Sequence, residues 1–387
     1  MTHSAFIFSP EQLMYKFHDN HPFNQQRLSI TTDLLIKSGA LREDQIIPAR
    51  KATLEELLLV HDEDFVSAVM SAQEGQLKSA FKTKYGLGTE DTPTFPMMHD
   101  AASWLVGGTL QACDLIFEHG YQHALNLGGG LHHGFRGKAS GFCVYNDSSI
   151  AIEYMKKKYN ARVLYVDTDA HHGDGVQWAF YEDPDVCTLS FHESGRFLFP
   201  GTGGVTERGH NKGYGTSFNV PFEAFSEDSS MLEAYEKVLR KVIEAFKPDV
   251  ILTQNGADSH YFDPLTHLCG TLHYFHEIPK LAHKLAHEYC EGRWIAVGGG
   301  GYDIWRVVPR AWATIWLEMT NQQNIRQQPI PQEWVQQWQK DAPVTLPTSW
   351  DDPPGLYPAV PRKKEIEEKN NKIVEQALKL ISESHVE

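Results

Sequence analysis

The chain has 387 residues, of which 41% are hydrophobic and 22% are charged, a composition typical of a folded globular protein with a sizeable core. The net charge of -15 argues against nucleic-acid binding, which needs clustered basic residues. The five cysteines form no C-x-x-C pair and no apolar run approaches the ~20 residues of a membrane span, so we expect a cytoplasmic protein with free thiols and no membrane partner.

Short β-rich segments alternate with helical patterns along most of the chain. Strands are expected at His123–Leu127, Val163–Asp167, Val186–Phe191, Ser217–Val220, Val250–Thr253 and Trp294–Val297. Helices are expected at Thr53–Leu59, Ala101–Phe117, Ser148–Tyr159, Ser229–Phe246, Ile278–Tyr289 and Pro309–Glu318. This alternation predicts an α/β domain whose mostly parallel sheet is covered by helices on both faces.

The composition changes near Asn321. Residues 327–362 are rich in Pro, Gln and Trp, which favours an irregular arm, and an amphipathic helix is expected from about Lys364. We therefore predict one large domain over residues 1–320. Residues 321–387 would form an arm and helix that pack on it.

Four of the predicted strands end in polar residues and glycines. The segments are GGGLHHG (residues 128–134), DTDAHHGDG (167–175), QNGADSH (254–260) and GGGGYD (298–303). In open α/β sheets, ligands bind in the crevice at the carboxyl ends of the strands. These four segments are therefore expected to converge in space.

The segment DTDAHHGDG has the pattern of a metal site. Asp167, Asp169 and His171 alternate in sequence, so an extended backbone would place them on one side. Buried carboxylates repel each other, and a divalent cation removes that cost. Asp169, His171 and Asp258 would form a three-ligand site with an open position for substrate, suited to Zn²⁺ and also to Fe²⁺.

The remaining polar residues suggest acid–base chemistry beside that metal. His132 and His133 on the glycine turn would transfer protons. Asp167 and Asp174 would orient these two histidines. Tyr302 would donate a hydrogen bond to an oxyanion across from the metal.

Competing motifs are incomplete. The glycine runs lack the third glycine of G-x-G-x-x-G, the chain has no Walker A sequence, and no G-x-S-x-G appears. His283 and His287 have i, i+4 spacing but lack the Glu of H-E-x-x-H. We therefore interpret this pair as structural.

These segments, together with others in order along residues 5–320, resemble the histone deacetylase family of zinc amidohydrolases. The further segments are HPFNQQR (21–27), YGLGTEDTP (85–93), ASGFCVYND (139–147), LSFH (189–192) and FPGTG (199–203). The resemblance implies the arginase/deacetylase fold, a three-layer domain with one sheet of about eight strands. It also implies a zinc-dependent hydrolase of linear amides that converts N6-acetyl-lysine in an acetylated protein to lysine and acetate.

The resemblance extends to individual residues of the site. It pairs His132 with Asp167 and His133 with Asp174, makes Tyr302 polarise the carbonyl, and favours His133 as the proton shuttle. The substrate-binding residues that it implies are Asp91 at the rim, Gly141, Phe142 and Phe199 around a narrow lysine tube, and Arg27 in a channel for acetate. A structural K⁺ ion would bind at Asp167, Asp169, His171, Ser190 and Phe191.

Two further features qualify the resemblance. The loop before Asp91 is one residue longer than in some family members, so we expect a rim of different shape. The segment PAVPRKKEIEEKN (358–370) resembles bacterial members that act in acetoin utilisation. That likeness implies acetyl-CoA synthetase as the protein substrate and a role in acetoin and acetate catabolism.

Three alternatives stay open. An arginase-type ureohydrolase holds two Mn²⁺ ions with a D-x-H-x-D run, but here Asp174 falls one position too late. An acetylpolyamine amidohydrolase would use the same chemistry, although a rim Asp91 suits a peptide backbone better. A non-catalytic scaffold that binds acetyl-lysine would not need His132, His133 and Tyr302.

Overall fold

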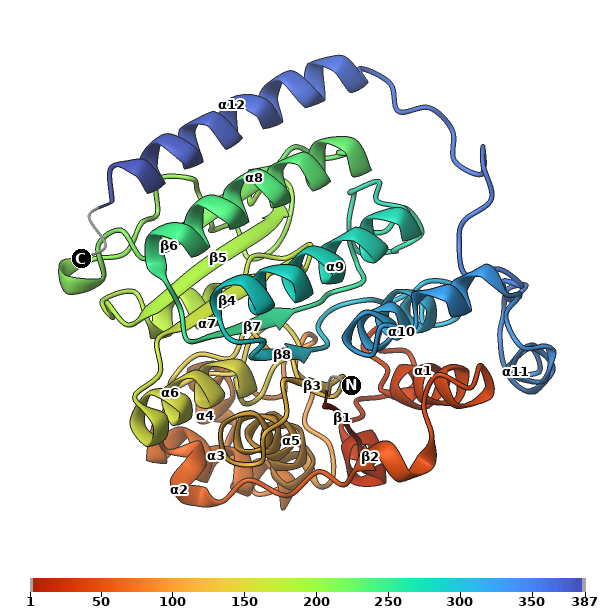
Figure 1. Cartoon of the computed structure of the whole chain (residues 1–387). Helices are drawn as coiled ribbons and strands as arrows, with labels where there is room; N and C mark the ends of the chain where they lie inside the picture. Colours follow the sequence, from red (N-terminus) through yellow and green to blue (C-terminus); the bar gives the residue numbers. More distant parts are fainter. Residues whose placement is uncertain (1–2, 385–387) are drawn as a thin grey trace.

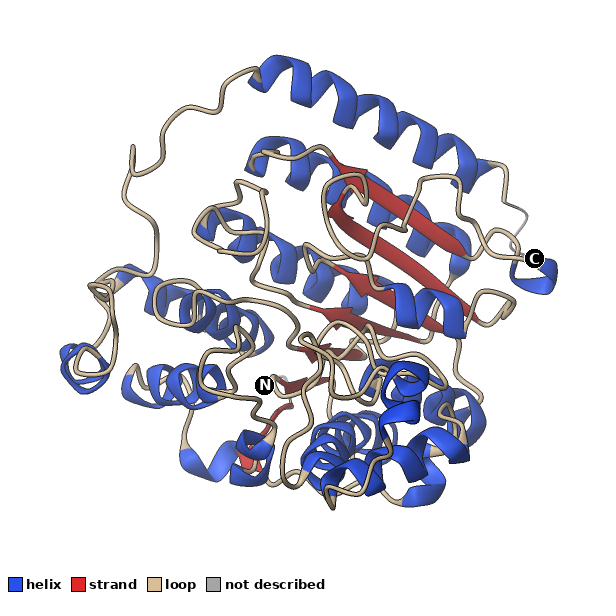
Figure 2. Cartoon of the chain, turned by 180° about the vertical axis from the view of Figure 1, so that it is seen from behind, coloured by secondary structure: helices blue, strands red, loops and turns tan. Residues whose placement is uncertain are grey.

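Eight parallel strands form one sheet through the middle of the molecule (Figures 1 and 2). The structure is a computed structural model that describes residues 3–384. The strands, in sheet order, are β2 (Ile46–Ile47), β1 (Ser4–Ile7), β3 (His123–Asn126), β8 (Trp294–Val297), β7 (Val250–Gln254), β4 (Val163–Asp167), β5 (Val186–Glu193) and β6 (Ser217–Phe222). The predicted parallel sheet is thereby confirmed.

Helices cover both faces of the sheet, and its central strands are therefore buried throughout. One face packs against α1 (Gln26–Lys37), α8 (Asp228–Phe246), α9 (Leu272–Tyr289) and α10 (Val308–Met319). The other packs against α2 (Leu54–Leu57), α3 (Glu63–Gln73), α4 (Ser79–Tyr85), α5 (Met98–Glu118), α6 (Asp147–Tyr159) and α7 (Asp174–Ala179). Short 3-10 turns occur at Pro10–Met14, Glu43–Gln45, Asn211–Gly213 and Gln323–Gln327.

The C-terminal region lies against the sheet domain. Helix α12 (Lys363–Ser382) runs beside α8 and the edge strand β6 (Figure 1). The arm before it is not wholly irregular as predicted, because it contains α11 (Gln332–Trp338), whose Trp334 is fully buried. The boundary at residue 320 stays a prediction, and its ranges include residues 1–2 and 385–387, which lie outside the described residues.

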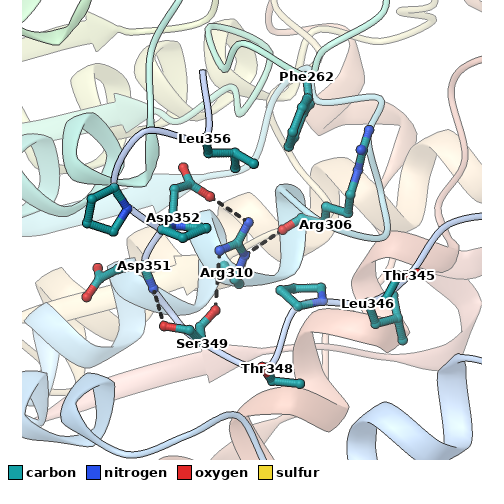
Figure 3. Close-up of a pocket in the computed structure, with 13 residues that line it drawn as sticks. Phe262, Arg306, Arg310, Thr345, Leu346, Thr348, Ser349, Asp351, Asp352 and Leu356 are labelled. Carbon is teal, nitrogen blue, oxygen red and sulfur yellow. Dashed lines mark hydrogen bonds and ion pairs between the residues drawn. The ribbon is translucent and has the colours of Figure 1, made fainter. Parts of the chain in front are cut away.

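A buried ion pair attaches the arm to the domain. Arg310 of α10 donates to the carboxylate of Asp352 (3.0 Å) and to the carbonyl oxygen of Ser349 (3.3 Å) (Figure 3). Asp352 also lies 3.1 Å from Nε2 of His260 and accepts from the backbone N–H of Leu272, which opens α9. Despite burial, its contacts with His260 and Arg310 lower the pKa of Asp352 below its usual range.

Most predicted elements occur within a few residues of their expected bounds. Strands β1 and β2 were not predicted, and β2 has only two residues, too few to show an alternation. Helix α9 begins at Leu272 and not at Ile278, because Thr271 caps it and Pro279 is accommodated inside it. The five cysteines are unpaired, and none of the described helices is both long and apolar enough to cross a membrane.

Candidate active site

The four polar segments meet because their strands are neighbours in the sheet. Strands β3, β8, β7 and β4 lie side by side in that order. Their last residues are in register: Asn126 pairs with Val297, Val297 with Gln254, and Gln254 with Asp167. The loops that follow these residues therefore leave the sheet at one edge and share one space.

Asp169, His171 and Asp258 form a buried cluster at this edge. Nδ1 of His171 lies 2.9 Å from Oδ2 of Asp258 and 3.2 Å from Oδ1 of Asp169. One ligand atom from each of the three lies within 4.8 Å of the other two. The backbone N–H of Gly300 donates to Asp169 (2.6 Å), and that of Ala170 donates to Asp258 (2.9 Å), so both carboxylates are held in place.

The electrostatics of this cluster fit a divalent cation. Burial and the charge of Asp169 raise the pKa of Asp258 to about 6. Burial also opposes the ionisation of Asp169, but the charge of His132 and the contact with His171 hold its pKa well below the usual range. A divalent cation would neutralise these two buried carboxylates, and the nitrogen and oxygen donors suit Zn²⁺ or Fe²⁺.

Two histidine–carboxylate pairs flank the cluster. Nδ1 of His132 lies 2.8 Å from Asp167, whose same oxygen accepts from the hydroxyl of Tyr165 (2.7 Å). Nδ1 of His133 lies 2.7 Å from Asp174. The two imidazole rings are 4.0 Å apart, and Nε2 of each is the nitrogen left free for chemistry.

The surroundings shift the pKa values of His132 and His133 in opposite directions. Burial lowers the pKa of His132, but the charges of Asp167 and Asp169 outweigh this and raise it to about 9. Burial and the neighbouring charge of His132 lower the pKa of His133 to about 4. His132 is thus a cation at neutral pH, whereas His133 is neutral and able to accept a proton.

Tyr302 lies on the glycine run after β8. Its backbone N–H donates to the buried carboxylate of Asp263 (2.9 Å), and its ring contacts that of Phe142 edge-on at 5.9 Å. Burial and the charge of Asp258 raise the pKa of the phenol well above its usual value. Tyr302 therefore keeps its proton and can donate a hydrogen bond.

Gly141, Phe142 and Phe199 lie together beside His133. Gly141 has a φ of +49°, and a Cβ there would lie 2.5 Å from Cδ2 of His133 and 2.9 Å from the ring of Phe199. Only glycine fits at this position, because a side chain would collide with the rings of His133 and Phe199. Phe199 is 45% exposed and packs edge-on against His133 at 5.0 Å between ring centroids.

Asp91 and Arg27 lie at different depths. Asp91 is exposed, and its carbonyl oxygen is 3.3 Å from Nε2 of His21. Arg27 is 1% exposed, donates to the carbonyl oxygen of Gly301 (3.0 Å), and stacks on Phe23. Burial lowers the pKa of Arg27 to about 10, so a cation remains behind the glycine run.

The residues expected to hold a monovalent cation are neighbours in the fold. Ser190 on β5 pairs in register with Asp167 on β4, and Phe191 follows it. The hydroxyl of Ser190 lies 2.8 Å from Nδ1 of His192. Asp169 and His171 lie on the loop that continues β4, close to these strand residues. The K⁺ site itself stays a prediction.

Several residues that were not predicted hold the catalytic loop in place. Gln254 donates to the carbonyl oxygen of Gly130 (2.8 Å), and the carboxylate of Asp147 accepts from the N–H of Gly130 (3.0 Å). The side-chain amide of Asn146 donates to the carbonyl oxygen of His132 (3.1 Å). Asn146 and Asp147 open α6, so the N-cap pattern at this helix start could have identified them.

His61 supports the same loop and gives a pH-dependent contribution to stability. Its Nε2 accepts from the backbone N–H of Asn146 (3.0 Å), and burial lowers its pKa to about 4. Between pH 4 and the unfolded value of about 6.5 the unfolded chain binds the extra proton, so stability falls as pH drops through this window. Replacing His61 with Gln should remove up to about 3 kcal/mol of this pH dependence.

Urea unfolding of the wild type and of His61→Gln at pH 7 and pH 4.5 measures this pH dependence of stability. The loss of unfolding free energy on acidification should be larger for the wild type than for His61→Gln, because glutamine does not titrate. Equal losses in the two proteins would show that His61 is not the group responsible.

Comparison with known proteins identifies the class to which this fold and site belong. Residues 21–319 match the histone deacetylase domain, and the chain belongs to the histone deacetylase family. It is accordingly a deacetylase, a hydrolase acting on amides.

Two curated relatives match nearly the whole chain. The acetoin utilization protein AcuC of Bacillus subtilis (strain 168) is 60% identical over 378 residues, which cover 98% of this chain and 97% of that protein. AcuC of Staphylococcus aureus (strain MRSA252) is 48% identical and covers 96% of each chain. The resemblance predicted for the bacterial members is thereby confirmed.

Solved structures show the same likeness and confirm the expected arginase/deacetylase fold. The crystal structure of a histone deacetylase homologue from Aquifex aeolicus superposes with a TM-score of 0.84 at 31% identity, covering 95% of this chain and 100% of that one. A homologue complexed with SAHA superposes with a TM-score of 0.85 at 31% identity, covering 96% and 100%.

Proposed function

We propose that the chain is a zinc-dependent protein lysine deacetylase that hydrolyses N6-acetyl-lysine to lysine and acetate. One observation carries the proposal: a buried Asp169–His171–Asp258 cluster lies beside His132 and His133, each paired with its own carboxylate. Asp169, His171 and Asp258 would hold the metal. When bound, Zn²⁺ supplies a Lewis acid for the amide carbonyl and lowers the pKa of water, and Fe²⁺ would fit the same donors.

The paired histidines divide the proton chemistry. Asp174 holds the Nδ1 proton of His133, so Nε2 is the nitrogen that takes a proton from the attacking water and returns it to the departing lysine amine. His132 shares its proton with Asp167 and contributes positive charge near the reacting carbonyl.

Tyr302 supplies the second group on the carbonyl. Its hydroxyl stays protonated and donates to the oxygen as negative charge develops there. Asp263 fixes the backbone at this position, and Phe142 supports the ring. This donor acts on the transition state more strongly than on the substrate, which is the condition for raising kcat.

The surrounding residues suit an acetylated lysine in a polypeptide. Phe142 and Phe199 would hold the four-carbon stem, and Gly141 leaves room between them. Asp91 at the exposed rim would accept hydrogen bonds from the substrate backbone. Arg27 would attract the acetate product, and a K⁺ ion beside β4 and β5 would stabilise the metal loop.

The physiological partner that we propose is acetylated acetyl-CoA synthetase. The support is the likeness to relatives named for acetoin utilization, which cover almost the full chain. A deacetylase acting on this enzyme would regulate acetate and acetoin catabolism.

An assay with metal-depleted protein tests the proposed reaction. Adding Zn²⁺ should restore release of acetate from an acetyl-lysine peptide, and release from N-acetylputrescine should be slower. Asp91→Ala should lower kcat/KM for the peptide and leave kcat/KM for N-acetylputrescine unchanged, because only the peptide offers backbone N–H groups to the rim.

Faster turnover of N-acetylputrescine than of the peptide would indicate an acetylpolyamine amidohydrolase. No turnover with Zn²⁺ or Fe²⁺, despite metal binding, would indicate a non-catalytic scaffold.

A further inference from the structure

Three histidines meet at the edge of the sheet opposite the proposed active site. His123 is the first residue of β3, and His283 and His287 lie one turn apart near the end of α9. The ring centroids are 4.6 Å apart for His123 and His283, 5.1 Å for His123 and His287, and 4.9 Å for His283 and His287. We call these three residues the histidine cluster.

The nitrogens of the histidine cluster converge. One ring nitrogen from each residue lies within 4.8 Å of the other two. Nε2 of His283 and Nε2 of His287 are 3.1 Å apart. Histidine nitrogens at this spacing are suitable ligands for a transition metal, and i, i+4 histidines on a helix can bind one ion together.

His123 supplies the independent observation. Its side chain is fully buried, and its Nε2 has no hydrogen-bond partner within residues 3–384. Its Nδ1 lies 3.3 Å from the hydroxyl of Ser4 on the adjacent strand, and Nε2 is the ring nitrogen left without a partner among the described residues. An unsatisfied buried polar atom destabilises a fold, so a ligand that binds this nitrogen would remove that cost.

Hydrogen bonding within the cluster does not remove this cost. A single hydrogen bond can join the Nε2 atoms of His283 and His287, but it leaves Nε2 of His123 unpaired. Among the described residues the cluster contains no carboxylate, which would otherwise make a charged pair.

We propose that His123, His283 and His287 bind a divalent transition-metal ion, Zn²⁺ in the first instance, at a second site that is separate from the active site. His287 is exposed and His283 is half-buried, so the ion can enter from solvent and keep water as a fourth ligand. Ser4 would orient His123 as an outer-shell partner, and the ring of Trp294 stacks on His283 at 5.8 Å. The ion would tie the end of α9 to the edge of the sheet.

Zinc stoichiometry of the untagged full-length protein tests the proposal. The metal content after equilibration with Zn²⁺ and removal of the free ion should be two ions per chain in the wild type. It should fall to one in His283→Gln, which keeps the active site, and to one in Asp258→Asn, which keeps the histidine cluster. His273→Gln is the matched control, because this exposed histidine lies on α9 outside the cluster and should leave two ions.

The outcomes separate this site from the active site. One ion in the wild type and none in Asp258→Asn would overturn the second site and leave the proposed function intact. One ion in the wild type and none in His283→Gln would instead place the only metal at the cluster and contradict the proposed function.

A second measurement tests the contribution of His123 without replacing it. The electron paramagnetic resonance spectrum of Cu²⁺ bound to Asp258→Asn reports the number of nitrogen ligands. A spectrum with three nitrogen ligands would support the proposed site at the histidine cluster. Two or fewer nitrogen ligands would show that His283 and His287 bind the metal without His123 and would overturn the role of His123.

Replacing His123 with Asn should, in the folded variant, weaken Zn²⁺ binding at least about tenfold.

Discussion

Replacing Asp258 with Asn is expected to abolish zinc-dependent deacetylation. The substitution keeps the size of the side chain but removes one of the two carboxylates of the Asp169–His171–Asp258 cluster. Affinity for Zn²⁺ at this site should fall by at least about tenfold, because losing an outer-shell partner alone costs that much. Acetate release and zinc titration in the His283→Gln background, where the histidine cluster does not contribute, measure the effect.

The stability of this variant distinguishes a lost ligand from a lost fold. In metal-depleted protein the charges of Asp169 and Asp258 repel each other, so Asp258→Asn should be at least as stable as its parent. Adding Zn²⁺ at about 100 times its Kd should stabilise the parent by about 2.7 kcal/mol and the variant by much less. Asp228→Asn is the control, because Asp228 bonds to Thr271 away from the site and should not change zinc affinity.

A variant that deacetylates at the parent rate with full zinc affinity would refute the ligand role of Asp258. A variant that unfolds in the absence of metal would point instead to a structural role for the contact between the Asp258 carboxylate and Nδ1 of His171.

Replacing Tyr302 with Phe is expected to lower kcat by roughly 10²–10³-fold, the effect of removing one oxyanion donor. KM should change little, because the phenol acts mainly after charge develops on the carbonyl oxygen. The ring remains, so its edge-on contact with Phe142 at 5.9 Å and the fold should persist. Steady-state kinetics with an acetyl-lysine peptide measure both constants.

Tyr261→Phe is the matched control for this substitution. Tyr261 is half-buried and its ring packs on Tyr357, away from the proposed catalytic groups, so its loss of a hydroxyl should leave kcat unchanged. If Tyr302→Phe retains full kcat, Tyr302 does not polarise the carbonyl. If it raises KM alone, the hydroxyl contributes to binding the substrate and not to catalysis.

The sequence alone determined the parts of this protein that depend on local pattern. Apolar runs such as Val163–Asp167 identify buried strands, because a parallel strand covered on both faces needs apolar residues throughout. Polar residues directly after four of these strands predicted where a site would form. The spacing of Asp169 and His171, together with the resemblance to the histone deacetylase family, named the residues now found close together.

Tertiary structure decided what depends on the order of strands and on contacts between distant segments. The support of the catalytic loop by Gln254, Asn146 and His61 has no periodic signal, because each makes its hydrogen bond to a loop distant in sequence. His283 and His287 alone indicated a structural pair. Only the sheet register that places β3 between β1 and β8 brings His123 against them, because the position of a side chain across a sheet is set by strand pairing and not by its neighbours in sequence.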